Sequence, residues 1–303
     1  MRRLLALALM LLAAAPAAAQ KLDATPRTAV MTAFPPEWYA MVGNIAAPVT
    51  YQVNGLSILT GTMEGKPVIL IQSGVSMVNA AMTTQLLLDR FAVKRIVFSG
   101  IAGGINPGLD IGDVVVPERW NQYMEVSLAR DTPRGWVPPE QRPVDSLPNY
   151  GMMFPRDVRV GSATEKPLPR RWFAADPALL DLARKVAVAT PLARCLPSSA
   201  ASACLARAPK IVVGGAGISG SAFADNARYR EYLFATFHAS VLDMESGAVA
   251  QVAFANSVPF IAFRSLSDLA GGDAGPNQMV TFMALASGNS ATVVRAFVAG
   301  LPD

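Results

Sequence analysis

Residues 94–104 read KRIVFSGIAGG, an apolar and β-branched run that passes directly into a cluster of glycines. Its apolar residues stand at consecutive positions, which is typical of a strand buried on both faces of a sheet. Gly100, Gly103 and Gly104 lack side chains, so the backbone here can approach a ligand closely and point N–H groups at oxygen atoms. The stretch predicts a central strand that ends at a ligand or in a tight turn without one.

Similar strand-like runs recur along the chain and alternate with helical segments. The other strands are predicted near residues 28–34, 66–72, 113–117, 210–215 and 258–265. Helices are predicted in residues 76–91, 176–187, 226–237, 246–257 and 289–301. Strands that alternate with helices favour a single α/β domain with a largely parallel or mixed central sheet flanked by helices.

The N-terminus has a different composition from the rest of the chain. Residues 1–19 contain Arg2 and Arg3, then a short apolar run and the small residues Ala17–Ala19, a pattern typical of a cleaved signal peptide. A membrane anchor is the alternative, but the run is short for a bilayer crossing. We expect an exported protein, periplasmic or secreted, whose domain covers residues 20–303. No later run is expected to span a membrane.

The charge balance of the exported chain points away from nucleic acid as a partner. Removing two of the 26 basic residues with the signal peptide leaves 24 against 22 acidic residues, a net charge of +2. Residues 120–175 are rich in proline, arginine and aromatic residues and show no clear periodicity. We interpret them as a loop-rich insertion over one edge of the fold, where long ordered loops often act as lids or binding loops.

The few cysteine and histidine residues limit the kinds of catalytic or metal site that the chain can form. Cys195 and Cys204 are predicted to form a disulfide in an exported protein, with two free thiols as the alternative. His238 is the single histidine, so a histidine triad or a histidine-rich metal site is excluded, and no metal or cofactor is expected. His238 is interpreted as a structural residue at the end of a helix. The glycine pattern of residues 214–220 matches a dinucleotide-binding motif weakly, because the next helix begins too late.

Acidic residues lie in two runs that otherwise have the composition of a core, two of them in the first run and one in the second. Glu245 belongs to VLDMESGAVA (241–250), and Asp268 to VPFIAFRSLSDLAGG (258–272). Buried acids are generally paired, so a structural ion network that joins Glu245 and Asp268 to Arg264 is one interpretation. A functional role for both acids is the other.

The order of three motifs supports the functional interpretation. SGIAGG followed by GDVVVP, then DMES, then RSLSD resemble the purine nucleoside phosphorylase and uridine phosphorylase superfamily over about residues 27–300. Within it, the chain is most similar to the 5′-methylthioadenosine/S-adenosylhomocysteine nucleosidases and to the bark and vegetative storage-type proteins of plants. The resemblance implies a nucleoside phosphorylase-like fold, a purine nucleoside as ligand and assembly into a homo-oligomer.

The resemblance also implies a substrate-binding set. Glu245 would accept hydrogen bonds from the two ribose hydroxyls, Met244 would pack on the sugar, and Phe223 would stack on the base. Three further residues complete this set, two from the glycine turn and one beside the Asp268 position: Ala102, Gly103 and Ser267.

The catalytic residues implied are Asp268, Glu37 and Arg264. Asp268 would donate a proton to the imidazole-ring nitrogen of the leaving purine, and Glu37 would activate water near Arg264. Cleavage of an N-glycosidic bond builds positive charge on the sugar and negative charge on the base, so a carboxylate near the ribose and a neutral acid at the base suit this reaction. Alternatively, Glu37 caps a helix that begins near Trp38.

The sequence therefore predicts a purine nucleosidase that hydrolyses a nucleoside, with 5′-methylthio or related nucleosides among the expected substrates. Two alternatives stay open: a phosphate-dependent phosphorylase, and a storage-type protein that binds nucleosides with little catalysis. The chain departs from the nucleosidase pattern at Ile101, where these enzymes usually have serine, and at Ala224, which replaces a larger aliphatic residue.

Overall fold

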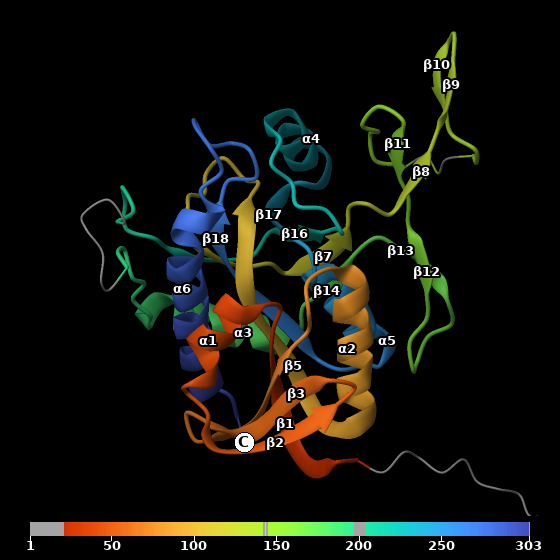
Figure 1. The fold of residues 1–303 in the computed structure, drawn as a ribbon. Coiled ribbons are helices and arrows are strands. Elements are labelled where there is room, and N and C mark those ends of the chain that lie inside the picture. Colours follow the sequence, from red (N-terminus) through yellow and green to blue (C-terminus); the bar gives the residue numbers. More distant parts are fainter. Residues whose placement is uncertain (1–20, 142, 144, 197–203, 303) are drawn as a thin grey trace, which may run out of the picture.

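The computed structural model describes residues 21–302 apart from 142, 144 and 197–203 (Figure 1). The predicted signal peptide lies outside the described residues and stays a prediction. The described chain is built on a mixed sheet of twelve strands flanked by helices, as the sequence predicted. A path of hydrogen-bonded neighbours runs β14-β7-β16-β17-β5-β1-β4-β3-β2, and β18 joins it beside β5 and β6, with β15 on β6.

The strands of this sheet have the following bounds: β1 Asp23–Thr32, β2 Ala46–Val53, β3 Leu56–Met63, β4 Lys66–Gln72, β5 Phe91–Gly104, β6 Val114–Val116, β7 Arg119–Gln122, β14 Phe173–Ala174, β15 Ile211–Val213, β16 Ala216–Ser219, β17 Ala239–Asp243 and β18 Phe260–Asp268. The middle strands β4, β1, β5 and β18 run parallel, while β17 lies antiparallel to the end of β5. Their carboxyl ends meet at one edge, which is where open α/β sheets usually bind ligands.

Helices cover both faces of the sheet (Figure 1). One face carries α1 (Pro35–Val42), α3 (Pro177–Ala189) and α6 (Met279–Ala299), and the other carries α2 (Met77–Arg90) and α5 (Ser246–Ala255). A further helix, α4 (Ala227–Phe237), packs against β17. Asp176 caps α3 as predicted, because its Oδ1 accepts a hydrogen bond of 3.0 Å from the Leu179 N–H.

The two faces of the central strands contribute to two separate cores. In β5, Ile96 and Phe98 pack toward α2 and α5, whereas Val97 between them packs toward α6. In β1, Met31 likewise belongs to the core that contains Ile96 and Phe98, and Val30 to the core that contains Val97. Burial of both faces explains why these strands read as continuous apolar runs rather than alternating ones.

Helix α6 differs from the prediction in two respects. It begins at Met279 instead of near residue 289, since Gly288 lies inside the helix and interrupts the helical pattern. Its 21 residues are also long enough and apolar enough to cross a membrane by length and composition, which the sequence analysis did not expect. More than half of its most apolar window is buried, and the helix packs on β18 and β5 as a core helix.

The predicted insertion, residues 120–175, contains short strands that the sequence analysis did not identify. β7 and β14 pair with each other at the edge of the main sheet. The remaining strands form two-stranded ribbons that project away from the sheet (Figure 1): β8 Val126–Leu128 with β11 Met153–Pro155, β9 Arg130–Thr132 with β10 Gly135–Val137, and β12 Val158–Val160 with β13 Leu168–Arg170. Strands of two to four residues are too short to show a hydrophobic period.

Two smaller predictions are confirmed. Cys195 and Cys204 are joined by a disulfide. His238 ends α4, where it adopts the left-handed conformation with φ of 51° and its N–H donates to the carbonyl of Phe234. This is a structural position, as predicted.

Candidate active site

A cavity of about 210 Å³ opens at the carboxyl ends of β1, β5 and β18. All but one of the predicted site residues line it: Glu37, Ala102, Gly103, Phe223, Met244, Glu245, Ser267 and Asp268. They come from segments far apart in the sequence, which the sheet brings to one edge. Arg264 is the exception, because it is fully buried behind the cavity.

Gly100 makes room for the centre of this site. It lies directly opposite Arg264 in the parallel pairing of β5 with β18. A Cβ atom at Gly100 would lie 1.9 Å from Nη1 of Arg264 and 2.5 Å from Oε1 of Glu37. The glycine turn of the sequence is therefore needed for the close approach of charged side chains to the strand backbone.

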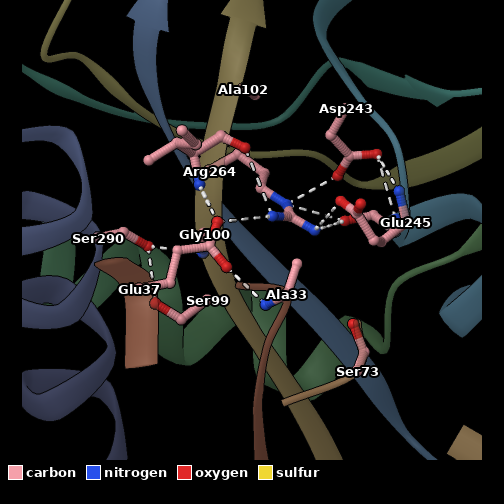
Figure 2. Close-up of polar contacts among 12 residues, drawn as sticks. Ala33, Glu37, Ser73, Ser99, Gly100, Ala102, Asp243, Glu245, Arg264 and Ser290 are labelled. Atoms are coloured by element: carbon pink, nitrogen blue, oxygen red, sulfur yellow. Dashed lines mark hydrogen bonds and ion pairs between the residues drawn. The ribbon is translucent and has the colours of Figure 1, made fainter. Parts of the chain in front are cut away.

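The guanidinium of Arg264 lies among three carboxylates (Figure 2). Its Nε is 2.7 Å from Oδ2 of Asp243, its Nη1 is 3.7 Å from Oε1 of Glu37, and its Nη2 is 3.8 Å from Oε2 of Glu245. Nε and Nη2 also donate to Oγ of Ser246 at 3.0 and 2.8 Å. Burial of one cation with three acids is tolerable only with such dense pairing.

Glu37 connects this charge cluster to β1 and β5. It is the third residue of α1, and its Oε2 accepts a 2.5 Å hydrogen bond from the Ala33 N–H. Its Oε1 accepts from the Ile101 N–H at 2.9 Å. Burial raises the pKa of Glu37, while Arg264 and the backbone donors oppose that rise. One oxygen thus bonds the backbone just before α1, close to the capping interpretation, and the other lies near Arg264; activation of water by Glu37 stays a prediction.

Glu245 lies at the start of α5 and is held by two other segments. Its Oε1 accepts a 2.8 Å hydrogen bond from the Ser76 N–H at the start of α2. Burial raises the pKa of Glu245 to about 7; Arg264 opposes the rise, and the negative charge of Asp243 adds to it. Glu245 lines the cavity, and a carboxylate has lone pairs enough to accept hydrogen bonds from a pair of hydroxyl groups besides the Ser76 N–H.

Asp243 organises this part of the site, and the sequence analysis did not select it. Its Oδ1 accepts from the N–H groups of Glu245 and Ser246 at 3.2 and 3.1 Å, and from Oγ of Ser219. It therefore caps α5 and fixes the backbone of Glu245. An acid three residues before a helix is a recognisable capping signal, which is present in the DMES motif.

Asp268 is the last residue of β18 and also lines the cavity. A register shift between Leu266 and Asp268 breaks the strict alternation of β18, and both Ser267 and Asp268 line the cavity. Oδ1 accepts from the Ala270 N–H at 2.8 Å, and Oδ2 from Oγ of Ser267 at 2.9 Å. Burial raises the pKa of Asp268, and these hydrogen bonds oppose the rise. No ion pair with Arg264 is present among the described residues, so the predicted network includes Glu245 but leaves Asp268 out.

The remaining cavity wall is largely apolar. Phe223 is 55% exposed and lies at the mouth, where its ring is available to a ligand. Further apolar residues that the sequence analysis did not select are Phe34, Val75 and Met279. Ile101 also lines the cavity, and its backbone N–H donates to Glu37. Its side chain has no hydroxyl to offer to a ligand.

Among the described residues, no group of three or more His, Cys, Asp or Glu side chains is placed to hold a metal ion. The cavity presents carboxyl groups, backbone N–H groups and apolar side chains to a ligand. Buried acids around a largely apolar cavity, at the carboxyl ends of a mixed sheet, define an α/β protein with a small-molecule binding site.

Comparison with known proteins assigns the family. The model of the phosphorylase superfamily matches residues 27–299, and the chain belongs to this superfamily. It is 30% identical over 246 residues to the 5′-methylthioadenosine/S-adenosylhomocysteine nucleosidase of Mycobacterium tuberculosis, covering 81% of this chain and 87% of the relative. It is 31% identical over 243 residues to the nucleosidase of the same name from Halalkalibacterium halodurans, covering 80% and 84%.

Solved structures of such nucleosidases share the fold. The enzyme from S. pneumoniae with the transition-state inhibitor MT-ImmA has a TM-score of 0.66 at 22% identity, covering 91% of this chain and all of that chain. The enzyme from Neisseria meningitidis in complex with methylthio-immucillin-A has a TM-score of 0.65 at 23% identity, covering 91% and 99%. The resemblance identified from the three motifs is thereby confirmed at the level of the family and the fold.

Proposed function

We propose that this protein hydrolyses the N-glycosidic bond of a purine nucleoside, releasing the base and the free sugar. The observation that carries this proposal is the placement of Glu37, Glu245 and Asp268 around one apolar cavity. The relatives named above are nucleosidases, which supports hydrolysis over the alternatives. In the reaction, the bond from sugar C1′ to the base nitrogen breaks, and the oxygen of water forms the new bond to C1′.

Asp268 is proposed as the general acid at the base. Its raised pKa favours the protonated form, which can donate to the imidazole-ring nitrogen of the purine as the bond breaks. The same side chain is held by the N–H of Ala270 and the hydroxyl of Ser267, so its direction is fixed before the substrate arrives. Protonation turns an anionic leaving group into a neutral base.

Glu245 is proposed to bind the two ribose hydroxyls. Glu245 and its neighbour Met244 line the same cavity as Asp268. A negative charge near the sugar also stabilises the positive charge that develops there in the transition state. Asp243 and Ser76 are expected to hold the carboxylate in place through the backbone contacts described above.

Glu37 is proposed to accept the proton of the attacking water. Burial raises the pKa of Glu37, and a carboxylate with a raised pKa has a stronger tendency to take a proton. Arg264 touches Glu37 and Glu245 instead of the cavity, so its proposed role is to balance and position these carboxylates. It corresponds to the predicted arginine near the water site, now with a specific set of partners.

Phosphorolysis is the less favoured alternative on the charges of the site. A phosphate site needs free positive charge, but none of the described residues that line the cavity is lysine, arginine or histidine. The nearby guanidinium of Arg264 is already matched by three acids, and Phe98 in β5 is buried against that guanidinium at 4.2 Å. A carboxylate at the position of Glu37 would repel phosphate by about 4 kcal/mol at 4 Å in a surface-like dielectric.

A 5′-methylthio nucleoside is the proposed substrate class within the purine nucleosides. The names of the relatives support it, and so does the apolar wall formed by Phe34, Val75 and Met279. An apolar wall gains from contact with a thioether and offers nothing to a charged 5′ group. Export and homo-oligomer formation are proposed as well; the disulfide between Cys195 and Cys204 supports export to an oxidising compartment.

Base release from methylthioadenosine, adenosine and inosine, compared with calorimetric binding of the same nucleosides, tests this proposal. Release of the base with free sugar as the second product supports a nucleosidase. Binding of a nucleoside without release would establish the storage-type alternative. Sequencing the N-terminus of protein secreted by its source cells tests export, with residue 20 expected as the first.

A further inference from the structure

Ser76 has a backbone conformation that serine rarely adopts. Its φ is 85° and its ψ is 157°, a region that is populated almost entirely by glycine. Ser76 is also the N-cap residue of α2, a position where a serine hydroxyl normally accepts a hydrogen bond from the first turn. Here the side chain makes no such bond. The residue thus gives up both a relaxed backbone and its usual capping contact.

Two other contacts take the place of these losses. The Ser76 N–H donates to Oε1 of Glu245 at 2.8 Å, across 169 residues of sequence. The Ser76 hydroxyl donates to Oγ of Ser221 at 2.9 Å. Ser221 directly precedes the residues of the loop that line the cavity, among them Phe223. One strained residue therefore joins the carboxylate proposed to bind ribose to the loop at the mouth of the cavity.

We propose that Ser76 and Ser221 form a clasp that holds the strained backbone of Ser76, so that its N–H positions Glu245 for the ribose hydroxyls. Ser76 is a positioning residue in this account, since it acts on the substrate through Glu245. The inference rests on the proposed function in taking Glu245 as the ribose ligand. Without the clasp, a residue with a Cβ relaxes toward negative φ, and the N–H turns away from Glu245.

Glycine at position 76 separates the two parts of this role. Ser76→Gly removes the hydroxyl, but glycine adopts the positive φ without strain, so its N–H stays directed at Glu245. Ser76→Ala removes the same hydroxyl and keeps the strain. The clasp predicts that Ser76→Ala and Ser221→Ala weaken riboside binding alike, by about 2- to 10-fold for one modest hydrogen bond, whereas Ser76→Gly weakens it less than Ser76→Ala does.

The experiment measures equilibrium binding of formycin A, a purine C-nucleoside whose bond from base to sugar is not hydrolysed, and of free adenine. Wild type, Ser76→Ala, Ser76→Gly and Ser221→Ala are compared. Ser57→Ala is the control, because it loses an exposed serine hydroxyl on the remote strand β3. Ser221→Ala is then repeated in the Ser76→Gly background. We expect weaker formycin A binding with unchanged adenine binding in the two alanine variants, and no effect of Ser221→Ala when position 76 is glycine.

Equal binding of formycin A by wild type and Ser221→Ala would overturn the clasp, and so would an effect of Ser221→Ala that persists beside Ser76→Gly. Ser221 is exposed, so its variant tests the proposal even where Ser76→Ala does not fold. The proposed hydrolysis is judged separately from turnover. A wild-type protein that binds formycin A but cleaves no purine nucleoside would contradict hydrolysis, while the binding comparison still decides the role of Ser76.

Discussion

Nη1 of Arg264 lies 3.7 Å from Oε1 of Glu37, and both side chains are almost completely removed from solvent. The same guanidinium contacts Asp243 and Glu245, so one buried cation is shared by three acids. Three ionised carboxylates around one guanidinium leave excess negative charge in a region with little water to stabilise it. Burial raises the pKa values of Glu37 and Glu245, and at Glu245 the negative charges of Asp243 and Glu37 add to the rise.

Asp268→Asn is expected to lower turnover of purine nucleosides by about 10²- to 10⁴-fold, the usual contribution of general acid catalysis. An amide keeps the shape of the side chain but has no acidic proton to give to the base. Steady-state kinetics on methylthioadenosine measures the effect, with Asp181→Asn, an exposed acid on α3, as the control. Wild-type turnover in Asp268→Asn would remove Asp268 from the mechanism.

Glu245→Gln is expected to weaken binding of ribosides far more than binding of free adenine. Each charge-assisted hydrogen bond from a carboxylate to a ribose hydroxyl is worth about 1.5–3 kcal/mol, and an amide provides only one acceptor oxygen. Calorimetry with formycin A, its 2′-deoxy analogue and adenine measures the difference. The ribose assignment fails if the riboside and the 2′-deoxyriboside lose the same affinity.

Stability is expected to fall as pH rises from about 4.5 to about 7, in part because of Glu245. The pKa of this group is about 7 in the folded protein against 4.5 for an unperturbed glutamic acid, so the folded state binds more protons between these values. Stability therefore decreases with rising pH across that window, by about 3 kcal/mol at most from this group. Urea unfolding of wild type and Glu245→Gln across pH 4–8 measures it, and parallel curves for the two proteins would contradict the assignment.

Gly100→Ala is expected to abolish activity and to destabilise the fold. The added methyl group would lie within 1.9 Å of Arg264 and 2.5 Å of Glu37, closer than any atoms can approach, and neither buried side chain is free to move away. Gly43→Ala is the matched control, because a Cβ there meets no atom within 4 Å. Thermal melting and turnover of both variants decide this, and an active, stable Gly100→Ala protein would show that the cluster can rearrange.

Much of the sheet could be predicted from the sequence because its central strands are buried on both faces. β4 has the predicted bounds of Lys66–Gln72. β18 begins two residues later than the predicted run of residues 258–265 and ends three residues later, at Asp268. β2 was missed because it is mostly exposed and contains Pro48, although Val49, Tyr51 and Val53 alternate with polar residues. The short strands of residues 120–175 contain only two to four residues each, which is too few to show a hydrophobic period.

The candidate site could be predicted where ionisable residues stand in runs that are otherwise apolar. Glu245 and Asp268 stood out as acids in apolar runs, and both line the cavity. Ser76 could not be found in the same way, because its importance arises from a backbone angle and a contact across 169 residues. Asp243 was missed for a simpler reason. The DMES motif was interpreted through Glu245 alone, so the capping role of Asp243 in the same motif was not considered.

The most direct test of the central claim is cleavage of methylthioadenosine in phosphate-free buffer, repeated with added phosphate and with Glu37→Gln. If water is the attacking group and Glu37 its base, wild type forms adenine and free methylthioribose at a rate indifferent to phosphate. Glu37→Gln then loses about 10²- to 10⁴-fold of that rate. Strict dependence on phosphate, with a sugar 1-phosphate as the product, would contradict hydrolysis and establish a phosphorylase.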